Sequence, residues 1–576
     1  MAELKFSTLE EMPLLAISLE STQVISTGSW RHVRPMYVQR ASPCEIGCPA
    51  GEKIPEYFEL LRRGRYEEAW RKILEDNPLP GVMGRVCYHP CESSCNRAQF
   101  DSPIAIHLIE RFVADKNFSN TAPMPLLESR KSERVAIVGS GPSGLSCAYQ
   151  LARRGYNVTI YEAEAKPGGM LRYGIPQYRL PRRVLDKEIG DILRLGVQLR
   201  LNARVGENIS LSELKAYDAI YVAVGAQRSR RLGVEGEELD GIRTGVDFLR
   251  EINSGAKPTM SSKVVVIGGG NTAIDAARSS RRLGAEVTIV YRRTRAEMPA
   301  VPEEIEEAEK EGVEFLFLAA PVRFHGEGGR VKKIEVQRMT LGEPDASGRR
   351  RPVPVANSNF FIEAGTVLTA IGEEPDLSLL SSSDLSMLLR EEGGRIRVDE
   401  HQMTGVPGIF AGGDVATNPL GTVVNAIRAG KNAALAIHEY LGWKKREDAT
   451  LGEVVEYKTI NLAYFAHEQR VRAGRLAIAE GIKNFREVNR GLSQSQALRE
   501  VDRCFSCGTC IHCDVCMNFC PDVAISKDAA GEYVIDYNHC KGCGICVAEC
   551  PREAMALSAE LAFTAVGSKG SEEQEV

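Results

Sequence analysis

The sequence predicts an α/β protein in which one nucleotide-binding domain is inserted into another, with cysteine-rich domains at both ends. Two observations support this. Glycine-rich turns that follow an apolar strand and open a helix occur twice, at 139–144 and 268–273. Fifteen of the sixteen cysteines lie in two groups, 44–95 and 504–550, outside both glycine-rich units. A chain of 576 residues is long enough for several such domains.

Composition excludes several classes of function. The net charge of −5 and the pI of about 6.1 imply neither nucleic acid nor a membrane surface as a partner. No apolar run approaches the roughly 18 residues of a membrane span, and the first residues lack a cationic signal segment. We expect a cytoplasmic protein whose clustered cysteines are metal ligands rather than disulfides. No C-x-x-C accompanies either glycine-rich unit, which argues against a disulfide reductase.

The first glycine-rich unit predicts a Rossmann-like FAD site. An apolar strand, 135–138, leads into a G-x-G-x-x-G turn, and the next predicted strand ends at Glu162. The glycines admit a pyrophosphate at the helix N-terminus, and the acid accepts ribose hydroxyls. A glycine-rich turn of another α/β protein is the alternative. The lone Cys147 is expected to be a buried apolar side chain. The residues predicted to bind FAD are Gly139, Gly141, Pro142, Ser143, Gly144, Glu162, Gly169, Leu171, Arg179, Gly413, Asp414 and Thr422.

The second unit predicts a nicotinamide nucleotide site. A strand at 263–267 leads into a G-x-G-x-x-A turn, and the following strand ends in two arginines instead of an acid. Arginine at this position accommodates a 2′-phosphate, so NADPH is favoured over NADH. Solvated arginines at a strand end are the alternative. The predicted residues are Gly268, Gly270, Asn271, Thr272, Ala273, Arg292, Arg293 and Gly372.

The C-terminal cysteines form a doubled C-x2-C-x2-C-x3-C-P pattern, typical of bacterial ferredoxins with two [4Fe-4S] clusters. In that pattern the fourth cysteine of each run crosses to the other cluster, and a zinc ribbon is the alternative. Cys504 and Cys507 fall outside the pattern, and they either bind metal themselves or pack beside a cluster. The predicted ligand sets are Cys510, Cys513 and Cys516 with Cys550, and Cys540, Cys543 and Cys546 with Cys520.

The N-terminal cysteines lie on either side of two helical patterns, 54–63 and 66–75. Cys44 and Cys48 precede them, and Cys87, Cys91 and Cys95 follow. Soft thiolate ligands select an iron–sulfur cluster or zinc, and spacing alone does not decide between these. Prolines beside the cysteines favour the iron–sulfur interpretation.

Seven motifs in order resemble the small (β) subunit of NADPH-dependent glutamate synthase and the FAD/NADPH half of dihydropyrimidine dehydrogenase: CEIGCP, GRVCYHPCESSC, GSGPSG, GGMLRYGIPQYRLP, GGGNTAID, VYRR and GIFAGGD. The resemblance covers about residues 41–440. The C-terminal part resembles the fused two-cluster domain of longer members, which serve sulfite reductase-like enzymes, 2-oxoacid:ferredoxin oxidoreductases and related complexes.

The resemblance implies cluster ligands near the N-terminus. It assigns Cys48, Cys87 and Cys91 to one cluster, with Glu110 as a non-cysteine fourth ligand. A second set retains only Cys44 and Cys95, because residues 30–43 lack the C-x-x-C that other members carry. We therefore expect one N-terminal [4Fe-4S] cluster and two at the C-terminus.

These interpretations give a domain map. We expect an α-helical iron–sulfur domain at 1–130, a discontinuous FAD domain at 131–250 and 366–442, and an NAD(P)H domain at 251–365. A helical connector at 443–503, an α+β ferredoxin-like domain at 504–564 and a disordered tail at 565–576 complete the map.

The expected function is electron entry or exit. Hydride passes between NADPH and FAD, and single electrons pass through clusters to or from a partner redox enzyme or a ferredoxin. No acid–base pair or nucleophile is required. The alternatives are a glutamate synthase small subunit and a scaffold subunit without turnover. A self-contained reductase would need a further barrel of about 250 residues.

Overall fold

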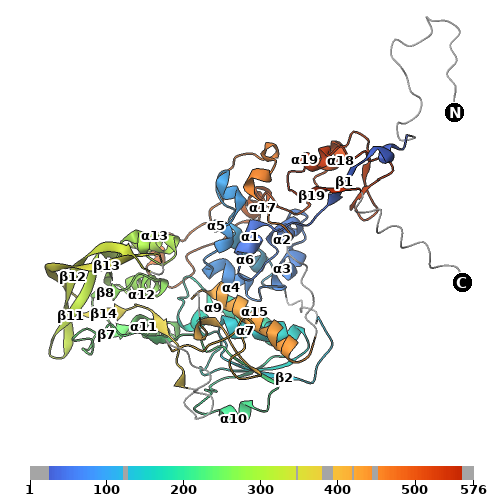
Figure 1. Ribbon diagram of the computed structural model, residues 1–576. Coiled ribbons are helices and arrows are strands. Elements are labelled where there is room, and N and C mark those ends of the chain that lie inside the picture. Colours follow the sequence, from blue (N-terminus) through green and yellow to red (C-terminus); the bar gives the residue numbers. More distant parts are fainter. Residues whose placement is uncertain are drawn as a thin grey trace, which may run out of the picture.

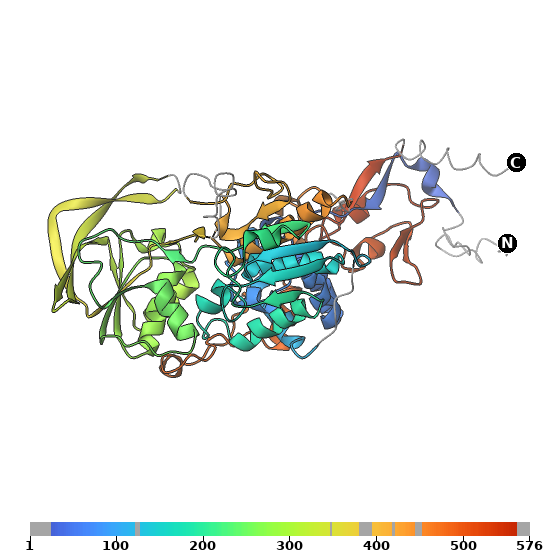
Figure 2. The same ribbon diagram turned by 90° about the horizontal axis from the view of Figure 1, so that it is seen from below.

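The computed structural model describes residues 25–120, 127–345, 348–378, 394–417, 421–443 and 452–560. Figures 1 and 2 show four parts in an elongated arrangement, with the inserted nucleotide-binding domain (green and yellow) at one end and the C-terminal domain (red) at the other. Among the helices in these ranges, none combines the length and the apolarity of a membrane span. The predicted tail, 565–576, lies outside the described residues.

The first nucleotide-binding domain is built on a parallel five-stranded sheet in the order β16-β5-β2-β3-β4. The apolar runs of its central strands are buried, as a parallel sheet covered on both faces requires. The predicted strand–turn–helix unit is present, because β2 leads into α7 (Pro142–Arg153). The strands are β2 (Arg134–Val138), β3 (Asn157–Tyr161), β4 (Gln198–Arg200), β5 (Ala219–Val222) and β16 (Ile409–Ala411).

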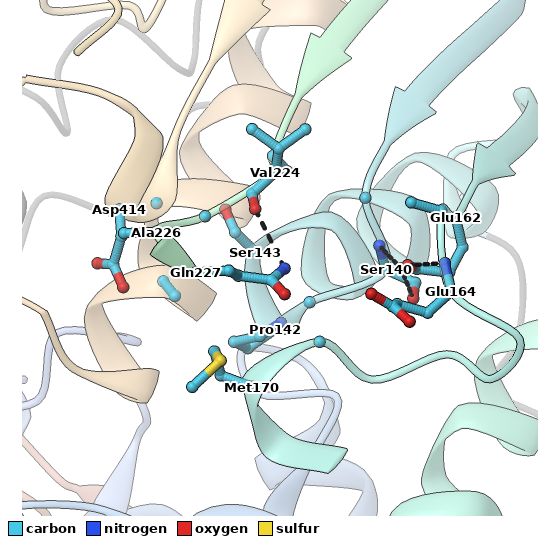
Figure 3. Close-up of a pocket in the computed structure, with 18 of the residues that line it drawn as sticks. Ser140, Pro142, Ser143, Glu162, Glu164, Met170, Val224, Ala226, Gln227 and Asp414 are labelled. Carbon is cyan, nitrogen blue, oxygen red and sulfur yellow. Dashed lines mark hydrogen bonds between the residues drawn. The ribbon is translucent and has the colours of Figure 1, made fainter. Parts of the chain in front are cut away.

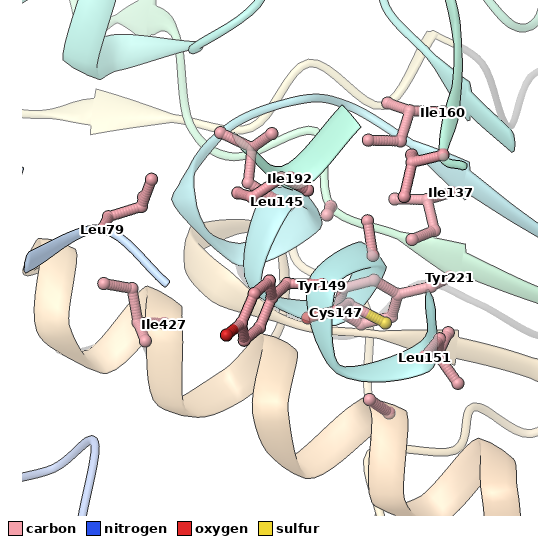
Figure 4. Packing of buried hydrophobic residues seen from close by; sticks show 14 of the residues in the cluster. Leu79, Ile137, Leu145, Cys147, Tyr149, Leu151, Ile160, Ile192, Tyr221 and Ile427 are labelled. Atoms are coloured by element: carbon pink, nitrogen blue, oxygen red, sulfur yellow. The ribbon is translucent and has the colours of Figure 1, made fainter. Parts of the chain in front are cut away.

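Helix α7 packs directly on α15 (Val423–Tyr440). Figure 4 shows α7 side chains, among them Leu145 and Cys147, in the core that also contains Ile427 of α15. Cys147 is fully buried, as expected. The two backbones approach closely at Gly430, where an added Cβ would lie 2.1 Å from the carbonyl oxygen of Ser143. Glycine at this position therefore sets the spacing of the two helices.

The inserted domain is built on a second parallel sheet, in the order β10-β9-β8-β14-β7. The sequence-based domain map places strands β7 and β14 in the FAD domain, within 131–250 and 366–442. The structure shows that this part of the map is wrong. β14 hydrogen-bonds between β8 and β7, and its apolar residues fill this sheet, so the domain extends beyond 251–365 at both ends. The strands are β7 (Ile242–Thr244), β8 (Lys263–Ile267), β9 (Glu286–Tyr291), β10 (Glu314–Phe317) and β14 (Thr366–Thr369).

A three-stranded antiparallel sheet, which the sequence analysis did not predict, covers the far side of this domain. It comprises β11 (Ala319–Glu327), β12 (Arg330–Pro344) and β13 (Arg350–Glu363). Figure 2 shows it in yellow at the end of the molecule opposite the C-terminal domain. Ile334 and Val336 of β12 are buried in one cluster with Val265 and Ile267 of β8.

The N-terminal domain is helical, as predicted. Its helices α2 (Ile54–Arg62) and α3 (Tyr66–Leu74) match the two predicted patterns to within a residue. Both pack with α6 (Ile106–Lys116) around buried Tyr57, Phe58 and Ile109. The cysteines lie on short helices at the edge of this core, namely α1 (Pro43–Gly47), α4 (Pro80–Val86) and α5 (Pro90–Ser93), and in the turns after them.

The C-terminal domain has the predicted α+β character. It contains α18 (Val515–Asn518), α19 (Ile545–Ala548) and a hairpin of β17 (Ile525–Lys527) with β18 (Tyr533–Ile535). Its last strand, β19 (Met555–Ala559), pairs antiparallel with β1 (Val33–Tyr37) near the other end of the chain. Residues 33–37 therefore belong to this domain, which corrects the boundary drawn at 1–130.

The connector at 443–503 is not mainly helical. In its described part, 452–503, there are two α-helices. α16 (Ile478–Gly481) is a single turn, and α17 (Gln494–Asp502) has nine residues. The remainder runs along the other domains without regular helix and forms hydrogen bonds with them. For example, the Val488 N–H donates to the Tyr178 carbonyl at 3.0 Å. Charged residues that looked helical in pattern instead make ion pairs with neighbouring domains, as Arg475 does with Glu307.

Gly430→Ala is expected to destabilise the protein by about 1–3 kcal/mol, because the new methyl group must push α15 away from α7. Thermal unfolding followed by circular dichroism should show a midpoint lowered by about 2–4 °C per kcal/mol. Gly190→Ala in α9 (Arg182–Leu193) is the matched control, since its nearest neighbour would be 3.9 Å away. An unchanged midpoint for Gly430→Ala would contradict the packing argument.

Candidate nucleotide and metal sites

A cavity of about 400 Å³ opens at the carboxyl ends of β2, β3 and β5, where a nucleotide binds in folds of this class. Figure 3 shows that its walls come from the β2–α7 turn, the end of β3, the loop after β5 and the segment after β16. Ten of the twelve residues predicted to bind FAD line it: Gly139, Gly141, Pro142, Ser143, Glu162, Gly169, Leu171, Gly413, Asp414 and Thr422.

The β2–α7 turn has the form of a pyrophosphate cradle. Gly139 has φ +106°, and an added Cβ would meet the Ala223 carbonyl at 2.5 Å. Gly141 has no heavy atom within 4 Å of an added Cβ, so its backbone is open to the cavity. Gly144 does not line the cavity; its Cβ would lie 2.0 Å from the Gly139 carbonyl, so this glycine lets helix and turn pack. The N-terminal N–H groups of α7 therefore face the cavity.

Two carboxylates lie on opposite sides of the cavity (Figure 3). Glu162, at the end of β3, accepts hydrogen bonds from the backbone N–H of Ser140 at 2.9 Å and of Glu164 at 2.8 Å. These donors hold its carboxylate in place at the position expected for ribose recognition. Asp414 follows β16, and burial raises the pKa of its carboxyl group. A cavity with a phosphate cradle between two acceptors fits an extended dinucleotide such as FAD.

Arg179 was predicted to bind FAD, and the structure corrects this. Its buried guanidinium pairs with Asp275 of the inserted domain at 2.7 Å and with Glu304 at 3.3 Å. Arg172, considered for phosphate contact, pairs with Asp186 instead. The partners of Arg179 lie about a hundred residues further along the chain, where no local motif reveals them.

Other cavity residues were missed by sequence reasoning. Gln227 follows β5 and donates to the Val224 carbonyl, and Arg250 of α11 (Gly245–Asn253) donates to Gln227 at 2.8 Å and to Glu164 at 2.5 Å. Arg250 thus places a positive charge at the cavity wall. Neither residue belongs to a glycine motif, so the sequence carried no signal for them.

The second glycine turn opens α12 (Asn271–Arg282). Gly268 has φ +146°, and a Cβ there would lie 2.1 Å from the Ala370 carbonyl, while Gly270 has open space around it. Asn271 accepts from the Val301 N–H at 3.0 Å, and Thr272 donates to Glu373 at 3.1 Å. The first turn of this helix is thereby fixed, with Ala273 buried beneath it and Gly372 on the neighbouring β14 turn.

The two arginines after β9 differ in their surroundings. Arg293 is buried and donates to Asp345 at 2.6 Å and to the Arg350 carbonyl at 2.7 Å. Those bonds hold β9 to the antiparallel sheet, which corrects the prediction that Arg293 serves the nucleotide. Arg292 is exposed at the strand end, where a 2′-phosphate would lie.

A small enclosed cavity in the helical domain is lined by Cys48, Cys87, Cys91 and Glu110. Burial raises the pKa of Glu110, and the carboxyl group of Glu52, on the same wall, raises it further. Asn77 donates to both carboxyl groups, at 2.7 Å to Glu110 and 2.9 Å to Glu52. Three soft sulfurs and a carboxyl oxygen around one cavity fit an iron–sulfur cluster, whose iron would hold the thiolates ionised despite burial.

The C-terminal cysteines are neighbours in the crossed arrangement predicted. Burial raises the pKa of Cys510 to about 11, and the thiols that add to it are Cys516, Cys550 and Cys513. Burial likewise raises the pKa of Cys546 to about 12, with contributions from Cys540, Cys543 and Cys520. The fourth cysteine of each run thus lies beside the first three of the other, as two ferredoxin clusters require.

The fold and these sites define an oxidoreductase with FAD- and NADPH-binding domains and [4Fe-4S] domains at both ends. Residues 131–430 match the pyridine nucleotide-disulphide oxidoreductase family, and the chain belongs to it. Residues 35–122 match dihydropyrimidine dehydrogenase domain II with its 4Fe-4S cluster, and residues 533–556 match a 4Fe-4S binding domain. Within 131–430 the sole cysteine is Cys147, so no redox disulfide accompanies the nucleotide domains.

Three curated proteins are similar to this chain over most of its length. The chain is 43% identical to the NADP(+)-dependent formate dehydrogenase subunit beta of Moorella thermoacetica, over 81% of this chain and 70% of that protein. It is 40% identical to the NADPH-Fe(3+) oxidoreductase subunit beta of Geobacter sulfurreducens, over 81% and 75%. It is 36% identical to the glutamate synthase [NADPH] small chain of Escherichia coli, over 69% and 88%. The predicted resemblance to the glutamate synthase small subunit is confirmed.

Asp414→Ala is expected to weaken FAD binding roughly tenfold or more, because a buried acceptor facing the cavity is lost. Arg179→Lys keeps a positive charge beside Asp275 and should leave FAD affinity unchanged. Titration of the apoprotein with FAD, followed by flavin fluorescence, measures both. If Arg179→Lys weakened FAD binding and Asp414→Ala did not, the sequence-based prediction that Arg179 binds FAD would be correct.

Proposed function

We propose that this chain is an electron-entry subunit that takes electrons from NADPH and delivers them, through its cysteine sites, to a partner redox protein. One observation carries the proposal. The start of α15 contacts two cavities. Thr422 and Val423 line the cavity at the ends of β2, β3 and β5, here called the flavin-type cavity, and Val424 lines the cavity of Cys48, Cys87 and Cys91, here called the three-cysteine cavity. A nucleotide site and a metal site thus share one helix terminus, which suits electron transfer between them.

The chain's own residues bind and position the cofactors. Gly141 and the N-terminus of α7 hold the pyrophosphate of FAD, Glu162 holds its ribose, and Asp414 holds a polyol hydroxyl near the ring. Bound FAD would supply the conversion between hydride transfer and one-electron steps. In the inserted domain, Gly268, Gly270 and the N-terminus of α12 hold the NADPH pyrophosphate, and Arg292 holds its 2′-phosphate.

We propose three cluster ligand sets, and the proximity of the side chains within each set supports them. Cys48, Cys87, Cys91 and Glu110 hold one near the flavin. Cys510, Cys513, Cys516 and Cys550 hold a second, and Cys540, Cys543, Cys546 and Cys520 a third. Cysteines that serve as cluster ligands suit a reducing compartment such as the cytoplasm, which we propose for this protein.

The partner is proposed to be another redox enzyme subunit or a ferredoxin. Relatives named as the beta subunits of a formate dehydrogenase and of an Fe(3+) oxidoreductase support a multi-subunit enzyme. A glutamate synthase small subunit is the second candidate, favoured by the 88% coverage of that protein. The C-terminal ferredoxin-like domain, in which residues 533–556 match a 4Fe-4S binding domain, favours the first candidate.

Anaerobic addition of NADPH to the purified holoprotein is expected to bleach the flavin absorbance near its visible maximum, followed by loss of the broad iron–sulfur absorbance. The physical reason is that the nucleotide sites and the cysteine sites occupy one chain with a shared α15 terminus. Stopped-flow spectrophotometry measures the order of the two phases. A flavin that stays oxidised under excess NADPH would leave only the scaffold alternative.

Arg292→Ala is expected to raise the KM for NADPH roughly 10- to 100-fold, because a charged hydrogen bond to the 2′-phosphate is lost. The KM for NADH should not change, since NADH lacks that phosphate. Steady-state reduction of an artificial acceptor measures both constants. Arg351→Ala removes another exposed arginine of the same domain and is the matched control. Equal effects on NADPH and NADH would show that Arg292 does not read the phosphate.

A further inference from the structure

Four cysteines that belong to none of the three sets above meet at the junction of the helical domain and the connector. Cys44 lies on α1 and Cys95 follows α5, whereas Cys504 and Cys507 come from the C-x-x-C after α17, more than 400 residues away. Cys44 and Cys504 are buried in one cluster, against which Cys95 packs. The sequence predicts one N-terminal cluster because Cys44 and Cys95 alone do not complete a second ligand set.

Each of the four thiols is an electrostatic neighbour of the other three. Burial is the largest cause that raises the pKa of Cys44, and Cys95, Cys504 and Cys507 add to it. Burial also raises the pKa of Cys507 to about 12, with contributions from Cys504 and Cys95. Burial raises that of Cys95 to about 11, and Cys504 adds to it. Four convergent thiols form a complete ligand set.

Backbone contacts hold the two distant segments together. The Ala41 N–H donates to the Glu453 carbonyl at 3.1 Å, and the Val455 N–H donates to the Ala41 carbonyl at 3.0 Å. The Arg40 N–H donates to the Gly508 carbonyl at 3.3 Å. Gly508 has φ +75°, and a Cβ there would lie 2.4 Å from the Arg40 carbonyl. The chain before Cys44 and the chain after Cys507 are therefore fixed against each other.

The sulfurs have the donors that cluster thiolates use. The Ser506 N–H donates to the Cys504 sulfur at 3.3 Å, and the Asn96 side-chain amide donates to the Cys507 sulfur at 3.5 Å. The Ser42 hydroxyl lies 3.2 Å from the Cys44 sulfur. Hydrogen bonds to ligand sulfurs stabilise the ionised form and tune the potential of iron–sulfur clusters.

The spacing of the sulfurs favours a cluster over a single ion. A tetrahedral zinc ion would hold thiolate sulfurs about 3.8 Å apart, given Zn–S bonds of about 2.3 Å. In the part of the chain that the structure describes, no three cysteine sulfurs lie within 4.8 Å of one another. The one group of three ligand atoms that meets this limit there is His89, Glu92 and His107. A four-iron cluster spaces its ligand sulfurs more widely, because the iron atoms lie between them.

We propose that Cys44, Cys95, Cys504 and Cys507 together hold a further [4Fe-4S] cluster, so that the C-x-x-C after α17 supplies the two ligands missing near the N-terminus. This inference rests on the proposed function and extends it. The cluster would bond the start of the ferredoxin-like domain to the helical domain, and it would give the chain four clusters.

The position of this site makes it a relay. On one side, Cys44 is a neighbour of Cys91, a proposed ligand of the cluster nearest the flavin. Burial is the largest cause that raises the pKa of Cys91, and Cys44 is among the groups that add to it. On the other side, Arg552 lies among Cys504, Cys513 and Cys507, and burial lowers its pKa to about 10. Arg552 also donates to the Cys504 carbonyl at 3.0 Å. The four-cysteine site thus joins the flavin-side cluster to the first ferredoxin-like cluster.

Iron and sulfide analysis of anaerobically purified full-length protein tests the proposal. The wild type should contain about sixteen of each per chain, as four [4Fe-4S] clusters require. The double variant Cys504→Ser/Cys507→Ser should contain about twelve, and electron paramagnetic resonance after dithionite should integrate to one spin fewer. Cys147→Ser, which removes a buried thiol outside every set, is the matched control and should keep the wild-type content.

Two results would overturn the proposal. A wild type with about twelve iron atoms, with or without one zinc ion, would show that no cluster forms here. A double variant that keeps the wild-type iron would show the same. If the double variant does not fold, the wild-type count decides. Flavin bleaching by NADPH should persist in the double variant, with slower reduction of the ferredoxin-like clusters. Absent bleaching in the wild type would instead contradict the proposed function.

Discussion

The close packing of α15 on α7 is the constraint on which the electron-transfer arrangement depends. A glycine at 430 lets the two helix backbones approach to a distance at which any side chain would clash. Because α7 begins at the flavin-type cavity and α15 begins between that cavity and the three-cysteine cavity, their spacing fixes how the two sites face each other. Dense packing transmits such a constraint without slack.

A buried ionic network fixes the inserted domain against the first. Arg179 of the first domain pairs with Asp275 and Glu304 of the inserted domain. Within the inserted domain, Arg278 and Arg282 both pair with Glu311 at 2.6 Å. Burial alone would raise the pKa of Glu311, but Arg282 and Arg278 lower it to about 2. Buried pairs cost desolvation and contribute little net stability. The pairs between the domains specify one relative orientation, because any other orientation would separate Arg179 from Asp275 and Glu304 and leave buried charges unpaired.

The ferredoxin-like end is attached to the rest of the chain by its two extremities. β1 pairs with β19 from the N-terminal side, and the segment after α17 places Cys504 in the core of the helical domain. Arg97 strengthens this junction, since its guanidinium donates to the Arg503 carbonyl at 2.7 Å and lies 4.9 Å from the Phe505 ring. Segments remote in sequence therefore bring the cysteines of the two ends of the chain next to one another.

The sequence by itself determined the local units: both glycine turns, the helices at 54–62 and 66–74, and the ferredoxin spacing. Each depends on neighbours a few residues apart, where backbone geometry and ligand reach leave few choices. Tertiary structure alone decided that β7 and β14 join the second sheet, that Arg179 and Arg293 make ion pairs rather than bind nucleotides, and that Cys44 and Cys95 meet Cys504 and Cys507. These outcomes depend on partners that folding brings from far along the chain, and no local pattern records them.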